Sequence, residues 1–241
     1  MLAVLAGGTG SAKLVRGLAK TVTDNITIIV NVGDNIKLHG LHICPDIDTI
    51  LYTLSDQLNS GQGWGIKDDT YNFLHQVSKY GYDDWFKLGD KDLALHLVRT
   101  NLLNAGWTLS EATHVIAKRM DIAQTVLPAS NDHVETLIDT PQGEMHLQEF
   151  WVKLKGKPDV VGVKYVGSKK SQPAPNVVNT ILEAEKVIIC PANPVSSIGP
   201  MTHILGIKEA LIRARDRVVA ISPIICDNPV SGPADKFLRS I

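Results

Sequence analysis

Short apolar runs alternate along this chain with segments whose apolar positions recur every three to four residues. Leu2–Ala6 is entirely apolar, and residues 26–32 are almost all β-branched, as expected for strands buried on both faces. Between these runs, residues 12–20 carry Leu14, Val15 and Leu18 at helical spacing. The order of strand, glycine-rich turn, helix and strand is typical of the first unit of a nucleotide-binding α/β fold.

The same rhythm returns in the last third of the chain. The pattern predicts helices over residues 176–185 and 203–214 and strands over residues 187–190 and 218–222. Strands that alternate with helices imply a parallel sheet with right-handed crossovers. We therefore predict an α/β fold with a Rossmann-like parallel sheet as its core.

The middle of the chain, residues 56–152, is richer in helical patterns than the two ends. Residues 92–104 and 110–120 have helical spacing, the second opening on Ser110-x-x-Thr113 rather than a capping box. Residues 135–139 and 145–151 indicate a hairpin around Thr140-Pro141-Gln142-Gly143. We predict that residues 1–55 and 153–241 form the core and that residues 56–152 form a mainly helical insertion.

Composition and charge narrow the class of protein. The chain has 241 residues, of which 44% are hydrophobic and 20% charged, with a formal net charge of −1. This balance argues against bulk electrostatic binding to nucleic acid or an anionic membrane. No apolar run approaches the ~20 residues that span a bilayer. Three cysteines are too few for a disulfide framework, so we expect a reducing, cytoplasmic location.

Ligands of parallel α/β sheets bind beyond the carboxyl ends of the strands. That rule points to residues 7–11, 31–35, 191–199 and 223–232. The first of these segments lets backbone N–H groups approach a phosphate at a helix N-terminus, although a tight turn alone would also use its glycines. It is not a Walker A loop, and Lys13 stands where a dinucleotide fingerprint has its third glycine.

Acidic and basic residues near these loops each leave two interpretations open. Asp34 has the spacing of a ribose-binding acid or of a turn cap. Asp46 and Asp48 are either helix N-terminal acids or ligands of a hard divalent cation. Residues 87–92 read as a charged loop that caps a helix. His96 and Arg99 favour surface salt bridges over ligand contact, and the tryptophans favour the core, except Trp64 as a ring-stacking wall.

Together, these segments resemble the 2-phospho-L-lactate transferase family of deazaflavin coenzyme F-420 biosynthesis. The resemblance spans the chain, and its ordered runs are residues 7–13, 30–34, 45–52, 63–69, 87–92, 127–130, 148–151, 193–200 and 222–232. It implies transfer of a phospholactyl or phosphoenolpyruvyl group from a guanosine-diphosphate-linked donor, lactyl-2-diphospho-5′-guanosine, to 7,8-didemethyl-8-hydroxy-5-deazariboflavin. GMP leaves in this reaction, which needs Mg²⁺. The resemblance also implies a homodimer and further elements after Pro233, so we expect this chain to be short for the family.

The resemblance assigns roles to particular residues. It implies that Asp48 and Lys87 contact the deazaflavin, and we expect both to serve catalysis, Asp48 as the acceptor of the ribityl hydroxyl's proton. The donor phosphates would lie against Gly8, Thr9, Gly10, Lys13, Asn193, Ser196, Ser197 and Gly199. The magnesium candidates are Asp34, Asp46 and Asp48.

Two other functions compete with this one. A non-catalytic regulator that binds a nucleotide sugar on a related Rossmann-like fold shares a Gly-Gly-Thr-Gly start, but it does not require Trp64 or residues 87–90 and 148–151. An NAD(P)-dependent oxidoreductase is disfavoured by the missing third glycine.

Overall fold

The computed structural model describes residues 1–22, 25–226, 228–229 and 234–238. Its core is a five-stranded parallel sheet in the order β10-β9-β1-β2-β5. This arrangement confirms the predicted α/β class. The strands are β1 (Leu2–Ala6), β2 (Ile26–Val30), β5 (Thr125–Pro128), β9 (Lys186–Ile189) and β10 (Val218–Ala220).

The central strands of the sheet are buried from solvent. Every residue of β2 is buried, and so are four of the five residues of β1. These strands pair in register, with Leu2 opposite Ile26 and Ala6 opposite Val30. An apolar run with no polar alternation suits a parallel strand covered by helices on both faces.

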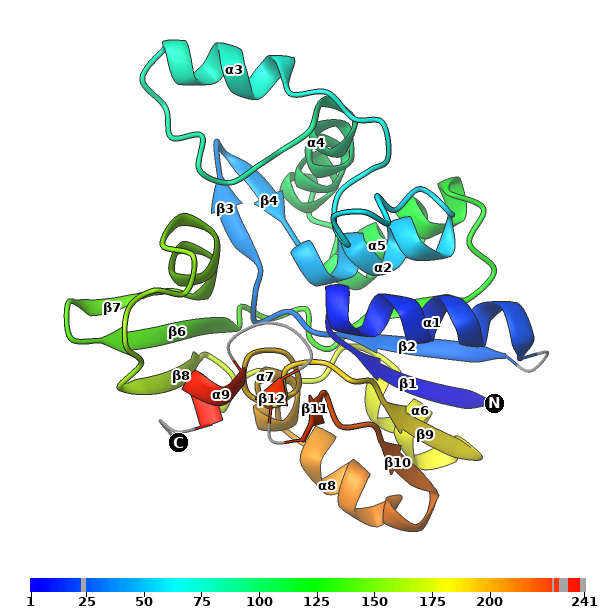
Figure 1. Ribbon diagram of the computed structural model, residues 1–241. Coiled ribbons are helices and arrows are strands. Elements are labelled where there is room, and N and C mark those ends of the chain that lie inside the picture. The colour runs from blue at the N-terminus through cyan, green and yellow to red at the C-terminus, as the bar shows by residue number, and fades with distance from the viewer. Residues whose placement is uncertain (23–24, 227, 230–233, 239–241) are drawn as a thin grey trace.

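The sheet is wound in two directions from β1. The chain passes through α1 to β2 on one side, whereas α6 and α8 lead into β9 and β10 on the other. Right-handed crossovers in opposite directions put their helices on opposite faces, and α6 packs on α8 while α1 packs on α2 (Figure 1). The order reverses between β1 and β9, so the loops after these two strands flank the switch point where such sheets bind ligands.

Helices of the core agree with the predicted positions but differ at their ends. The region 203–214 is divided, because Gly206 adopts a left-handed φ of 79° between two short helices. A capping box absent from the prediction is present: Thr108 and Glu111 cap each other's backbone at the start of α5. The helices are α1 (Thr9–Thr21), α2 (Pro45–Leu54), α5 (Leu109–Arg119), α6 (Val177–Glu183), α7 (Gly199–His203) and α8 (Ile207–Arg213).

Residues 56–152 do not form a purely separate insertion. They include β5, which pairs with β2 at the edge of the main sheet. The predicted hairpin is present but its second strand is short, since a π-helix follows at Glu149–Lys153. A small sheet joins β7 (Gly143–His146), β6 (Glu135–Thr140) and β8 (Gly162–Val166), and β8 comes from the stretch predicted as core.

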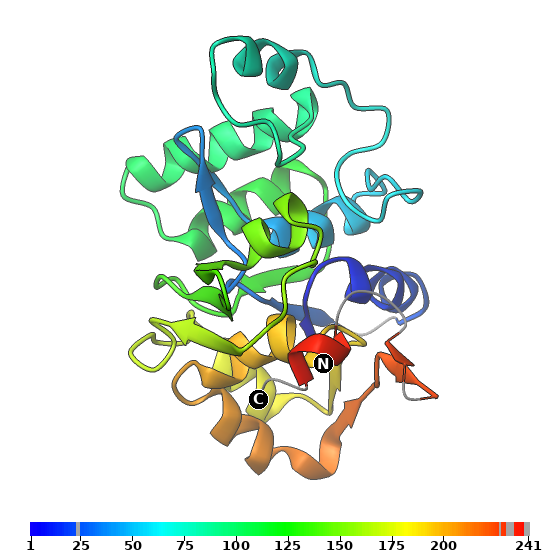
Figure 2. The ribbon, with the colours of Figure 1, turned by 60° about the vertical axis from the view of Figure 1, so that its left-hand side comes forward.

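The remaining elements surround the carboxyl ends of the core strands. Both views place α3 (Asn72–Lys79) and α4 (Asp90–Asn104) at one end of the molecule and α8 at the other (Figure 1, Figure 2). The strands β3 (Ile36–Leu38) and β4 (Leu41–Ile43) form a hairpin that packs on α4. Near the carboxyl terminus lie β11 (Ile224–Ile225), β12 (Asn228–Pro229) and α9 (Ala234–Leu238). The predicted motif at residues 231–233 and the last three residues lie outside the described part.

Within the described residues, none of the helices is long and apolar enough to cross a membrane. Cys44 and Cys190 are buried free cysteines, and Cys226 is exposed.

Candidate active site

A cavity of about 640 Å³ lies at the carboxyl ends of the central strands. It brings together residues that the sequence places far apart, from the loops after β1, β2 and β9 and from the region of α2 to α4. Most of the predicted site residues line it: Gly8, Thr9, Gly10, Asp34, Asp46, Asp48, Lys87, Asn193, Ser196 and Ser197.

The glycine loop presents free backbone donors to this cavity. The helix α1 has no acidic residue in its first turn and no side-chain cap. Among the described residues, no acceptor binds the N–H groups of Thr9 and Gly10. Unpaired N–H groups and the positive end of the helix dipole together attract an anion. This end of the cavity therefore suits a phosphate.

The loop after β9 packs directly on the glycine loop. A Cβ atom on Gly7 would come within 2.7 Å of the Ser197 side chain, and one on Gly10 within 2.7 Å of the Pro191 carbonyl oxygen. Glycine is therefore required sterically at both positions. Asn193 shapes the second loop, because its Oδ1 accepts hydrogen bonds from the N–H groups of Val195 and Ser196 at 2.9 and 3.1 Å.

Two buried carboxylates face each other beside the glycine loop. Asn31 Nδ2 donates to Asp34 Oδ1 and to Asp46 Oδ2, both at 2.9 Å. Burial, with repulsion from Asp46, raises the pKa of Asp34 well above its usual value. Burial also raises the pKa of Asp46 to about 6, against the hydrogen bonds from Asn31 and the Gly8 backbone. One amide does not neutralise two buried carboxylates, so this position favours a cation.

Asp48 has a different environment from this pair. Both of its oxygens accept hydrogen bonds from the Arg99 guanidinium, with the Nη1–Oδ2 distance at 3.1 Å. Arg99 is fully buried and Asp48 is 3% exposed. The Cys44 N–H group also donates to Asp48 Oδ2, at 3.3 Å. The predicted surface location of Arg99 and His96 is therefore wrong: they are buried beneath the cavity and paired with Asp48.

Lys87 reaches the cavity from a loop that is held in place on both sides. Leu88 is fully buried against the β3–β4 hairpin. Asp69 accepts hydrogen bonds from the N–H groups of Lys91 and Asp92 at the start of α4. Asp90 in turn accepts from the N–H group of Phe73 at the start of α3. Asp69 and Asp90 thus cap the starts of two helices, while the exposed Lys87 side chain remains available to a ligand.

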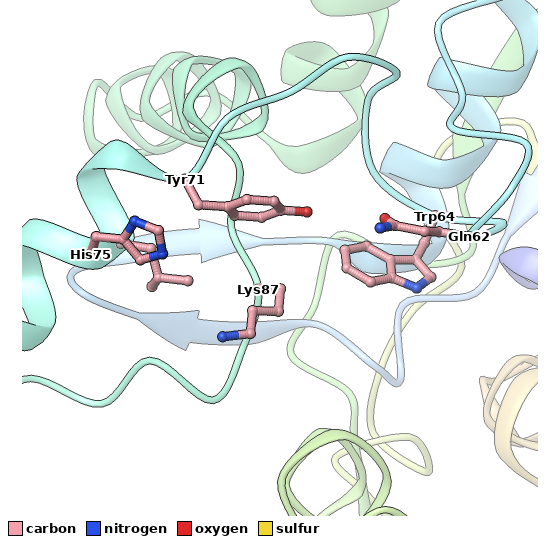
Figure 3. A pocket seen from close by; sticks show the side chains of 6 residues that line it. Gln62, Trp64, Tyr71, His75 and Lys87 are labelled. Atoms are coloured by element: carbon pink, nitrogen blue, oxygen red, sulfur yellow. The ribbon is translucent and has the colours of Figure 1, made fainter.

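An aromatic slot of about 280 Å³ adjoins the main cavity at Lys87. Figure 3 shows the rings of Trp64, Tyr71 and His75 grouped around the Lys87 side chain. Trp64 is 38% exposed and lies between Gly63 and Gly65, which have positive φ values of 77° and 69°. Only glycine adopts this conformation without cost, so the loop presents the indole outward. This geometry suits a planar, polar-edged ring system.

Two predicted site residues lie elsewhere. Lys13 is an exposed residue of α1 that does not line the cavity. Gly199 is buried against the Tyr165 ring, where a Cβ atom would collide. The cavity also contains residues to which the sequence assigned no role, and the tryptophans are less buried than predicted, since Trp107 and Trp151 are 45% and 43% exposed. The unassigned residues include Gln62, Phe86 and Lys155; Asp92 and His96 also line the cavity, although the sequence indicated a helix-capping loop for Asp92 and surface salt bridges for His96.

A metal ion in this site would need ligands beyond the protein. Within the described ranges, no group of three or more His, Cys, Asp or Glu side chains is placed to hold one. Mg²⁺ is commonly bound by one or two carboxylates together with substrate phosphates. The pair of Asp34 and Asp46 beside the glycine loop matches that donor set.

A parallel sheet wound in two directions, with a glycine loop of unpaired N–H groups beside its switch point, is typical of nucleotide-binding α/β proteins. The comparison with known families is more specific. Residues 2–241 match the family model of 2-phospho-L-lactate transferase CofD, and the chain belongs to this family.

Individual relatives carry two different names. The chain is 42% identical to the phosphoenolpyruvate transferase of Streptomyces griseus, over all of this chain and 77% of the relative. It is 42% identical to the 2-phospho-L-lactate transferase of Methanopyrus kandleri, with the same coverage of both chains. The corresponding enzyme of Methanosarcina acetivorans is 40% identical over 98% of this chain and 77% of its own length. A crystal structure from Bacillus halodurans shares the fold, with a TM-score of 0.66, 21% identity, and coverage of 99% of this chain and 74% of that one.

Proposed function

We propose that this protein transfers a 2-phospholactyl or phosphoenolpyruvyl group from a guanosine-diphosphate-linked donor to 7,8-didemethyl-8-hydroxy-5-deazariboflavin, with release of GMP. One observation supports the proposal most strongly. The glycine loop, the buried acid pair of Asp34 and Asp46, and the aromatic slot beside Lys87 all lie at one continuous cavity. Membership of the transferase family supports it. The relatives carry both names, so either acid remains open as the donor's group.

The donor's phosphates fit the core side of the cavity. The Thr9 and Gly10 N–H groups and the loop of Ser196 and Ser197 lie beside the acid pair. Asp34 and Asp46 would hold Mg²⁺, which supplies positive charge to the diphosphate when bound. Asp48 is less suited to that role than the other two, since Arg99 already neutralises it.

The acceptor fits the side formed by the inserted residues. The deazaflavin ring would lie between Trp64 and Tyr71, with the Lys87 ammonium at its polar edge. Asp48 faces the same cavity, and its lone pairs that Arg99 leaves free would orient the terminal ribityl hydroxyl. Displacement at phosphorus depends on charge neutralisation and in-line placement more than on a covalent nucleophile. Proton acceptance by Asp48 stays a prediction, and near-normal turnover of Asp48→Asn would rule it out.

One incubation tests the proposal. The protein is mixed with Mg²⁺, the deazariboflavin and either the lactyl or the enolpyruvyl guanylyl donor, and GMP and the product mass are measured. We expect GMP and a phosphodiester product with at least one donor. Absence of GMP with both donors would refute the transferase assignment, and tight binding of a nucleotide sugar without turnover would favour a regulator.

Two further features belong to this proposal. We expect a homodimer, which light scattering of the purified protein checks. We also expect the protein to work in the cytoplasm, and the buried thiols Cys44 and Cys190 are consistent with a reducing compartment.

A further inference from the structure

Asp92 is a second carboxylate on the wall of the cavity, and the reaction outlined above does not use it. It lies in the first turn of α4, and its side chain is 11% exposed. The Tyr52 hydroxyl donates a hydrogen bond to Asp92 Oδ1. No donor among the described residues reaches Oδ2, and this atom is not sealed off from solvent. Because Asp92 lines the cavity, the free oxygen is available to a ligand there.

The His96 ring lies between this carboxylate and that of Asp48. Its Nε2 atom lies 3.2 Å from Asp92 Oδ1, and its Nδ1 atom lies 3.5 Å from Asp48 Oδ2. The His96 side chain is 2% exposed. Arg99 neutralises Asp48, and within the described part of the chain it forms no hydrogen bond or ion pair with Asp92. The result is a row of hydrogen-bond acceptors on one wall of the cavity.

The sequence neighbours of these carboxylates lie at both ends of the cavity. Asp92 follows closely after Lys87, which lies at the aromatic slot. Asp48 is two residues from Asp46, whose carboxylate touches the glycine loop at Gly8. Lys87, Asp92 and Asp48 all line the main cavity, and Lys87 also lines the aromatic slot. An ionised carboxylate only accepts hydrogen bonds, so the part of the ligand beside this row should carry several hydroxyl groups.

We propose that Asp92 binds the secondary hydroxyls of the acceptor's ribityl chain and so selects acceptors with a polyol chain, while the Tyr52 hydroxyl holds Asp92 in position. This inference rests on the proposed function, because it takes the deazaflavin as acceptor. Its physical basis is that a site built to hydrogen-bond a hydroxyl rejects an analogue without it, since the buried group is then left unpaired. A purely structural role for Asp92, as the partner of Tyr52 at a helix start, predicts no such selection.

The test measures equilibrium binding by the fluorescence of the deazaflavin, so it needs neither donor nor turnover. Two acceptors are compared: the deazariboflavin, and an analogue whose 5-hydroxypentyl chain keeps the terminal hydroxyl but lacks the secondary ones. Hydrogen bonds to a charged group correspond to a roughly 10- to 100-fold change in binding. We expect the wild type to bind the analogue more weakly than the deazariboflavin by a factor in this range.

Variants separate binding from structure. Asp92→Asn should lose most of the preference for the ribityl chain, while its affinity for the hydroxypentyl analogue stays near that of the wild type. Tyr52→Phe removes the hydroxyl that holds Asp92 and should cause a smaller loss, confined to the ribityl acceptor. Asp216→Asn, which removes a carboxylate whose side chain is 93% exposed, is the matched control and should bind both acceptors as the wild type does.

Each other outcome has a definite meaning. Equal binding of both acceptors by the wild type would overturn the inference and leave the transferase assignment standing. An equal loss of affinity for both acceptors in Asp92→Asn would show a structural role and would also overturn it. If Asp92→Asn does not fold, an unchanged ribityl preference in Tyr52→Phe overturns the inference. A wild type that binds neither acceptor would refute both this inference and the proposed function.

Discussion

From the buried ion pair of Arg99 and Asp48 we predict how much the loss of Arg99 lowers the free energy of unfolding. Arg99 is the largest of the fully buried side chains in the described residues. Replacing it with methionine keeps most of the apolar volume and removes the guanidinium. Asp48 would then remain buried with the Cys44 N–H group and the His96 ring as its nearby polar partners. A buried carboxylate without a counter-charge is strongly disfavoured.

The size of the effect follows from this burial. Removing one partner of a buried ion pair costs about 3–5 kcal/mol. For a chain of this size, each kcal/mol lowers the melting temperature by about 2–4 °C, so Arg99→Met should melt roughly 6–20 °C lower. The loss is moderated because Arg99 Nε has no hydrogen-bond partner among the described residues, and its contact with the His42 carbonyl oxygen is long at 3.4 Å.

Urea unfolding of a double-mutant cycle measures the pairing itself. The variants are Arg99→Met, Asp48→Leu and the combination of both. We expect the double variant to be more stable than the sum of the single losses predicts, because it leaves no unpaired charge. A loss below about 1 kcal/mol in Arg99→Met, as for an exposed pair, would refute the reasoning. It would mean that Arg99 does not hold the carboxylate in place.

Three further predictions concern the metal, the acceptor and pH. With the guanylyl donor present to supply phosphate ligands, Mg²⁺ should raise the melting temperature of the wild type but not of Asp46→Asn. The exposed-site variant Lys13→Ala should respond as the wild type does, and calorimetry with and without Mg²⁺ measures the difference. Lys87→Met should weaken deazaflavin binding about tenfold, and fluorescence titration against the control Lys118→Met checks this; equal affinity in both variants would remove Lys87 from the acceptor site. Burial, assisted by the Arg99 charge, lowers the pKa of His42 from 6.5 to about 4. The unfolded chain therefore binds the extra proton first, and the contribution of His42 to stability is present above pH 6.5 and is lost as the pH falls toward 4. His42→Asn should flatten the pH dependence of unfolding in that window, and an unchanged slope would contradict the assignment.

The sequence predicts the core well because its signals there are local. A five-residue apolar run such as Leu2–Ala6 cannot be exposed without a large cost, and a glycine turn followed by helical spacing leaves few alternatives. The position of the phosphate loop then follows from the rule on strand ends. For the same reason the sequence singles out the acids Asp34 and Asp46, which follow a strand and start a helix, although it does not show that Asn31 joins them.

The helix α4 shows why the rest was not predictable. Asp92, His96 and Arg99 recur at helical spacing, which is also the pattern of a solvated polar face. In the structure this face is buried, whereas Leu97 and Val98 on the same helix are 50% and 49% exposed. Periodicity shows that residues share a face, but only the tertiary contacts show which face points inward. The partners of this face, Asp48 and Tyr52, lie 40 or more residues earlier.

Strand β5 makes the same point for the sheet. Thr125–Pro128 has four residues, and nothing local distinguishes it from an edge of the inserted region. Its pairing with β2 spans almost a hundred residues of sequence, and such pairings are not encoded in any short pattern. The boundary predicted for the insertion was therefore drawn around a strand of the main sheet.

The buried polar face of α4 contributes both to the stability of the fold and to the proposed selection of the acceptor. A helix that buries Asp92 and Arg99 requires a partner for each of them, and α2 supplies Tyr52 and Asp48. The same contacts fix both carboxylates at the wall of the cavity, so the residues that would recognise the acceptor are held by the network that joins α4 to the core. Loosening that network should therefore affect acceptor binding before it affects the phosphate loop, whose shape depends on the close approach of Gly7 and Gly10 to residues 191–197.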